Sequence, residues 1–190
     1  MSLTDQNQTF TGLNLVNGLV FVDGCSCLVE NFDWYSGSIG AEGKFSVMGY
    51  STISSNGSKI LLRQSIVEYF NILLILHPTL LQLHDYSEIR FNGNVIILYN
   101  LSFTGNGSVS NTNLLTIDSE SVLSFFSKFY QSETGSLILH SGHIHFNSLF
   151  LIEGNVTSPS HSNTILFNAE GSCIHSNIVL NSYSYFNDFF

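Results

Sequence analysis

Apolar residues recur along this chain as short pairs that flank a single intervening position, with small polar residues between one pair and the next. Leu81 and Leu83 form one such pair, and Ile89 and Phe91 form the following one. Alternation inside a pair is typical of a β-strand with one buried face. We therefore predict a series of short strands whose apolar side chains share one core.

The pairs return along most of the chain, and we expect their members to point into one continuous core. The residues assigned to this core are Leu83, Ile89, Phe91, Ile117, Leu123, Leu139, Ile144, Phe146 and Phe167. Four of them, Leu83, Ile117, Leu139 and Phe167, lie 34, 22 and 28 residues apart. Such spacing is typical of repeat proteins but too irregular for a propeller or a leucine-rich array. The pattern predicts an all-β fold, a right-handed parallel β-helix or β-solenoid.

An antiparallel β-sandwich is the alternative architecture, because many short strands are common to both folds. The small polar residues between regularly recurring pairs favour the solenoid. No change of composition divides the chain, so we expect one solenoid domain over residues 1–190, either a whole protein or a segment of a longer one. Polar loops are expected over residues 100–113 and 155–163, and a helical turn over residues 124–131.

The charge balance excludes several classes of partner. Five residues are basic and 14 are acidic, which gives a net charge of −9. Phosphate contacts need clustered Lys or Arg, so we expect no nucleic-acid partner and no attraction to an anionic membrane surface. No apolar run is long enough to span a membrane, so membrane insertion is not expected either.

Five Asn-x-Ser/Thr triplets occur in the chain. They begin at Asn7, Asn56, Asn100, Asn106 and Asn155. Such triplets are glycosylation acceptors only in a secreted protein, and a chain rich in Asn and Ser also forms them by chance. Because the polar residues are mostly uncharged, we expect a secreted or extracellular protein that carries glycans at these five positions.

The three cysteines give no clear disulfide framework. Cys25 and Cys27 would share one side of a strand, where a bond between them is geometrically awkward. Cys173 would reach either of them only if the chain ends approached, which a solenoid prevents. We expect buried thiols, with an intermolecular bridge as the alternative.

Acidic residues are candidates for catalytic groups because glycoside hydrolysis needs two facing carboxylates. The candidates that follow the apolar pairs are Asp85, Glu88, Asp118, Glu120 and Glu170. Asp85 and Asp118 would meet only if their coils were neighbours, and acidic residues also populate solvent-facing corners. Few basic residues are present to bind an anionic sugar polymer. We therefore expect no enzymatic activity and no catalytic residues.

The densest group of titratable residues comprises His140, His143 and His145. His143 and His145 would share one face of a strand, and two imidazoles bind a transition metal when a third ligand arrives. No such ligand lies nearby in the sequence. We expect neither a metal site nor a cofactor.

One block surrounds the sole tryptophan, Trp34, and is followed by glycines and by the strand-like run from Gly43 to Val47. This arrangement of residues over 31–53, together with the apolar pairs through about residue 181, resembles a known class of repeat region. That class is the parallel β-helix, pectin-lyase-like repeat region of large extracellular surface proteins of the adhesin type. The resemblance implies a non-catalytic structural or adhesive module of a surface or filament. A carbohydrate-active β-helix enzyme or a carbohydrate-binding β module is the alternative.

Aromatic residues gather near the end of the sequence. They are Tyr183, Tyr185, Phe186, Phe189 and Phe190. An exposed apolar cluster of this kind favours association, so we expect end-to-end self-association through this segment. Surface glycans or cell-surface proteins are the other expected partners. A segment that folds back over its own core, or that continues into a longer chain, is the alternative.

Overall fold

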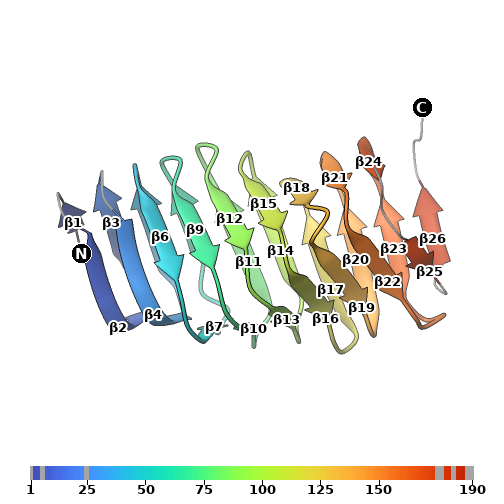
Figure 1. Ribbon diagram of the computed structural model, residues 1–190, viewed down its shortest axis with the longest axis horizontal. Helices are drawn as coiled ribbons and strands as arrows, with labels where there is room; N and C mark the ends of the chain where they lie inside the picture. The colour runs from blue at the N-terminus through green and yellow to red at the C-terminus, as the bar shows by residue number, and fades with distance from the viewer. Residues whose placement is uncertain (1, 5–6, 24–25, 174–177, 181–182, 187–190) are drawn as a thin grey trace.

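The chain forms a parallel β-solenoid of about eight turns, with no helix among the residues described in this computed structural model. Those residues are 2–4, 7–23, 26–173, 178–180 and 183–186. Successive coils stack along one axis and give an elongated body with its N-terminal coil at one end and its C-terminal coil at the other (Figure 1). The predicted all-β solenoid is confirmed.

The strands form three faces, which we name A, B and C, and from β5 (Gly37–Ala41) onward each coil contributes one strand to each face. Face A is a ten-stranded sheet. Its strands, in spatial order, are β1 (Ser2–Thr4), β3 (Leu19–Asp23), β5 (Gly37–Ala41), β8 (Lys59–Leu62), β11 (Thr79–Leu83), β14 (Leu101–Gly105), β17 (Ser121–Phe125), β20 (Gly142–Phe146), β23 (Thr164–Phe167) and β26 (Tyr183–Phe186).

Faces B and C are the two arms of a second sheet, joined at β4 (Ser26–Trp34), whose first part pairs with the first strand of face B and whose last part pairs with the first strand of face C. β2 (Gln8–Leu15) pairs along β4 on its other side. The strands of face B are β6 (Lys44–Val47), β9 (Ile66–Tyr69), β12 (Glu88–Phe91), β15 (Ser108–Asn111), β18 (Lys128–Gln131), β21 (Phe150–Ile152) and β24 (Gly171–Cys173). The strands of face C are β7 (Ser51–Ile53), β10 (Leu73–Ile75), β13 (Val95–Ile97), β16 (Leu114–Ile117), β19 (Ser136–Leu139), β22 (Asn155–Ser158) and β25 (Ile178–Leu180).

All strand pairs between described residues are parallel, so the antiparallel sandwich is wrong for this chain. Partners on neighbouring coils lie 18 to 22 positions apart, as for Ser26 beside Lys44 and Lys59 beside Leu81. The spacing expected from sequence mixed two faces, because Leu83 belongs to face A and Ile117 to face C. Only the step of 22 residues from Ile117 to Leu139 joins true neighbours in a stack.

Alternation along each strand sends every second side chain into the core. All nine residues that the sequence assigned to this core are 0–4% exposed, so that prediction is confirmed. The inward column of face A runs through Leu81, Phe103, Phe125, Phe146 and Phe167. Register brings equivalent side chains of consecutive coils directly together.

The phenylalanines of this column stack on one another. Ring centroids are 5.4 Å apart between Phe103 and Phe125, 5.4 Å between Phe125 and Phe146, and 5.2 Å between Phe146 and Phe167. The ring of Phe129, from face B, packs across the core 4.3 Å from that of Phe125. Stacked and tilted aromatic contacts of this kind add to the free energy gained by burying the rings.

Three local expectations were wrong. The expected loop over 100–113 contains β14 and β15, and that over 155–163 begins with β22. The expected helical turn over 124–131 is the end of β17, a corner and β18. Polar side chains in these stretches point outward or bond to corner carbonyls, so a polar composition did not prevent pairing with the neighbouring coils.

Cys27 is buried, as expected, whereas Cys173 is exposed. Seven strand-to-strand steps separate β4 from β24, or about 34 Å, so these two thiols are too far apart to bond to each other. Cys25 lies outside the described residues.

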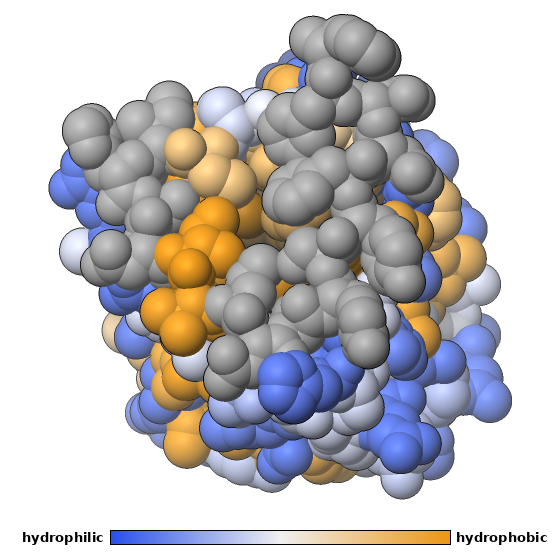
Figure 2. Space-filling model, turned by 90° about the vertical axis from the view of Figure 1, so that its right-hand side faces the viewer, coloured by the Kyte–Doolittle hydropathy of each residue, from blue (hydrophilic) through white to orange (hydrophobic). Residues whose placement is uncertain are grey.

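The aromatic C-terminal segment is only partly described. Tyr183, Tyr185 and Phe186 belong to β26, whose backbone pairs with β23 and extends face A of the chain's own solenoid. Phe189 and Phe190 lie outside the described residues. At this end of the molecule apolar side chains reach the surface (Figure 2), and Val179 is 58% exposed. End-to-end association through the segment remains a prediction.

We expect substitution of the aromatic column to cost far more than substitution of its neighbour on the outer surface. Phe125→Ala removes a ring that is 0% exposed and leaves a cavity, so the free energy of unfolding should fall by about 3–5 kcal/mol. Phe126→Ala is the matched control, because Phe126 is 52% exposed and its loss should cost at most about 0.5 kcal/mol. Denaturant titration measures both values, and equal losses would contradict the assigned register.

Candidate functional site

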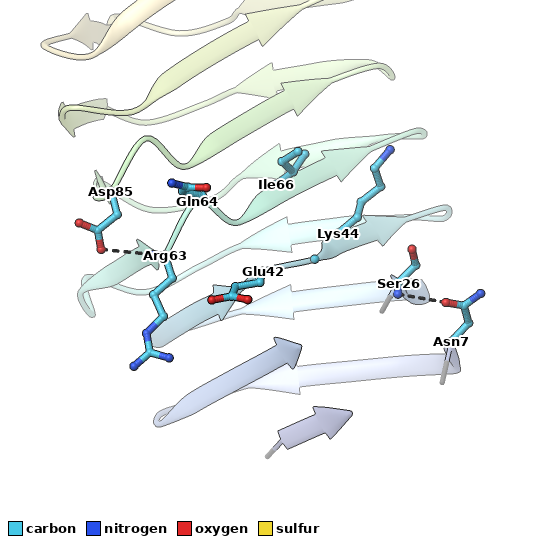
Figure 3. A pocket seen from close by; sticks show the side chains of 9 residues that line it. Asn7, Ser26, Glu42, Lys44, Arg63, Gln64, Ile66 and Asp85 are labelled. Atoms are coloured by element: carbon cyan, nitrogen blue, oxygen red, sulfur yellow. Dashed lines mark hydrogen bonds between the residues drawn. The ribbon is translucent and has the colours of Figure 1, made fainter. Parts of the chain in front are cut away.

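An open groove lies along the edge where strands of face A turn into strands of face B, which we name the A–B corner. It encloses about 770 Å³. Figure 3 shows one side of the groove formed by Asp85, Gln64, Arg63 and Glu42, the other by Lys44, Ser26 and Asn7, and Ile66 between them. These residues come from five successive coils, so the groove runs along the solenoid axis.

Two tight turns, stacked one above the other, build the wall of the groove. Arg63 and Gln64 form one turn, closed by a hydrogen bond from the Ser65 amide to the Leu62 carbonyl. Their φ angles are both 56°, in the left-handed region. Consecutive left-handed residues are the mark of a type I′ turn, which usually contains Gly or Asn because each larger residue costs about 1–2 kcal/mol there.

The second turn repeats this geometry one coil further on. Asp85 and Tyr86 have φ angles of 53° and 61°, and the Ser87 amide donates to the His84 carbonyl. Asp85 links the two turns, since its carbonyl accepts the Gln64 amide at 3.1 Å and its carboxylate accepts the Arg63 amide at 3.4 Å. The strained backbone is therefore held in place by its neighbour.

The charged groups of the groove differ in how they are paired. Lys44 makes an ion pair of 3.1 Å with Glu68, a nearly buried carboxylate that also receives Arg90 at 3.2 Å. Arg63 instead lies over the ring of Phe21, 5.2 Å from its centroid, in a cation–π contact. Among the described residues, neither Arg63 nor Glu42 forms a salt bridge. Both keep hydrogen-bonding capacity for a ligand.

The carboxylates considered for glycoside hydrolysis do not come together as a facing pair. Asp85 lies at the A–B corner, whereas Asp118 and Glu120 lie where face C turns into face A. Glu88 is bound to Arg90 at 2.7 Å on the outer surface of face B. Glu170 is at the A–B corner, four coils away from Asp85.

The histidine cluster divides between two places. His143 and His145 lie half-buried on the outer surface of β20, as alternation predicts, and His140 lies at the preceding corner. Burial and the charge of His143 together lower the pKa of His145. No group of three or more His, Cys, Asp or Glu side chains suited to a metal ion occurs in the part of the chain that the structure describes.

All five candidate glycosylation sites are exposed. Asn56, Asn100 and Asn106 lie at corners, and Asn155 is the first residue of β22. Asn7 lies at one end of the groove, where its side-chain oxygen accepts the Ser26 amide at 3.1 Å. Exposure is a requirement for glycosylation, and whether these sites are used remains a prediction.

Lys59 is a fully buried lysine in the aromatic column of face A, beside Leu81. Its ammonium donates to the carbonyls of Ser55 and Gly57, both at 3.0 Å, and thereby holds the five-residue corner between β7 and β8 from inside. No carboxylate of the described chain forms an ion pair with it. Burial lowers the pKa of Lys59 to about 8.

Sequence reasoning did not find the groove. Neither Arg63-Gln64 nor Asp85-Tyr86 resembles the Asn-Gly and Gly-rich pairs that mark tight turns. One usable signal was present, because Lys44 and Arg63 lie 19 residues apart, close to the length of one coil. Two of only five basic residues therefore had to fall near the same corner.

Comparisons with known proteins add no family to this description: no family model, no curated protein and no solved structure matches the chain. No helix long and apolar enough to cross a bilayer is found among the described residues.

The buried lysine should make stability rise in alkaline solution. The ordinary pKa of lysine is 10.5, so from pH 8 upward the native chain holds fewer protons than the unfolded chain, and the free energy of unfolding increases with pH. Burial also raises the pKa of Tyr69 above its ordinary value of 10, which gives the opposite trend above that pH. The effect of Lys59 on the free energy of unfolding is therefore measured between pH 8 and pH 10.

Lys59→Met should remove this rise, because Met fits an apolar column and does not titrate. Lys128→Met is the matched control, since Lys128 is exposed on β18 and should leave the pH dependence unchanged. Denaturant titrations at pH 8, 9 and 10 measure the effect. An identical rise in wild type and Lys59→Met would contradict the burial of a charged ammonium.

Proposed function

We propose that this chain is a non-catalytic structural or adhesive module of an extracellular surface or filament. The observation that carries the proposal is the unbroken stacking of about eight coils on one core. Each coil is hydrogen-bonded to the next on all three faces. This arrangement makes a stiff support rather than an enzyme that closes over its substrate. Its outward residues lie on a repeating grid with about 4.8 Å between coils.

The outer surface suits exposure to an extracellular medium. Uncharged hydroxyl side chains recur on every face, including Ser102 on face A, Ser110 on face B and Thr116 on face C. Several charges are gathered in one network around Glu68 and Arg90. Asp85 and Asp118 lie at different corners of the solenoid, and this placement favours a binding role over glycoside hydrolysis by that pair, which needs two facing carboxylates.

Surface labelling of an epitope-tagged chain in its native cell tests the proposal. We expect the tag to be labelled on intact cells, and endoglycosidase to increase the electrophoretic mobility of the protein. Asn56→Gln should remove one glycan, whereas Asn17→Gln should change nothing because Asn17-Gly18-Leu19 is not an acceptor triplet. Labelling only after permeabilisation, with no endoglycosidase shift, would overturn it.

A further inference from the structure

We propose that the A–B corner groove is a binding site for a neutral, hydroxyl-rich oligosaccharide. This inference rests on the proposed adhesive role and names the ligand class that such a module would bind. The groove, at about 770 Å³, is within the size range of small-molecule sites. It crosses five coils, that is four steps of about 4.8 Å, so a ligand about 19 Å long fits along it.

The chemistry of the lining points to a ligand that both donates and accepts hydrogen bonds. Most of the residues that line the groove have planar polar side chains, namely Asn7, Glu42, Arg63, Gln64 and Asp85. Guanidinium groups only donate, carboxylates only accept, and amides do both. A vicinal diol of a sugar ring offers a donor and an acceptor at adjacent oxygens, which matches this alternation along the wall.

The charge of the groove argues against an anionic ligand. Lys44 is already paired with Glu68, which leaves Arg63 beside two carboxylates, Glu42 and Asp85, in a chain whose net charge is −9. An anionic polymer would be repelled by the chain as a whole and would find no surplus of cations in the groove.

The backbone of the wall carries side chains where glycine would be cheaper. In the coil that follows, Gly105 ends β14 immediately before the same corner and takes its φ of 100° without strain. Arg63, Gln64 and Asp85 accept the strain instead. Strained positions that the surroundings hold in place concentrate at ligand sites, and here three polar residues that line the groove occupy such positions.

Titration calorimetry of the full chain, produced without glycans, tests the site with linear tetrasaccharides of glucose, mannose and N-acetylglucosamine, and with tetragalacturonate. We expect at least one neutral tetrasaccharide to bind and tetragalacturonate to bind at least tenfold more weakly. Gln64→Gly should lower the affinity at least tenfold and raise the melting temperature, because it removes a ligand contact and relieves a left-handed residue. A purely structural Gln64 would give the stabilisation without the loss of affinity.

Tyr86→Gly is the matched control. Tyr86 is left-handed in the same pair of turns but does not line the groove, so its replacement should raise the melting temperature and leave affinity unchanged. Unchanged affinity in Gln64→Gly, equal loss in Tyr86→Gly, absence of binding to all neutral tetrasaccharides, or preference for tetragalacturonate would each overturn the site. None of these outcomes bears on surface labelling, which tests the proposed function separately.

The glycan has two possible sources: a free oligosaccharide, or the glycan that the chain itself carries at Asn7. A second experiment, which compares glycosylated with unglycosylated protein, distinguishes them. In glycosylated protein, weaker tetrasaccharide binding that Thr9→Ala restores, by removing the acceptor triplet and leaving Asn7 in place, would identify the attached glycan as the occupant of the groove. Equal affinity in glycosylated and unglycosylated protein would identify a foreign glycan. Either result supports the groove as a glycan site.

Discussion

Parallel stacking of equivalent inward side chains from coil to coil is the constraint on which the rest of this structure depends. Phe103, Phe125, Phe146 and Phe167 meet at 5.2–5.4 Å because hydrogen bonding sets the distance between strands. A slip of one residue would turn every ring outward. Hydrophobic burial thus selects the register, and the register in turn selects which residues meet at each corner.

Several polar side chains enter the core and are received there by carbonyls or by neighbouring amides. Lys59 holds the corner between β7 and β8, whereas Asn163, in the corner between β22 and β23, donates to the Leu139 carbonyl of the preceding coil at 2.6 Å. Asn111 bonds to Gln131 of the next coil at 3.3 Å. A buried polar group is costly unless its hydrogen bonds are made, so these residues tie corner length to the core.

The corners provide the chemical variety that the faces lack. Strand positions are restricted by the pairing of neighbours, whereas corner residues are free to differ between coils. The groove arises because two successive A–B corners adopt the same strained turn and Asp85 bonds one turn to the other. A surface made this way is rigid before any ligand arrives, and rigidity of this kind reduces the entropy lost on binding.

The amino-acid sequence by itself determined the all-β class and the core, because alternation in pairs such as Leu81 and Leu83 requires a shared buried face. It favoured the parallel stack through the recurrence of these pairs, and the strand pairing of the tertiary structure decided against the antiparallel sandwich. It misjudged residues 100–113, since polar composition does not reveal that outward-facing Ser and Thr belong to paired strands. Only the tertiary structure decided where Arg63 and Asp85 meet. That contact depends on the length of one whole coil, which local patterns of sequence do not contain.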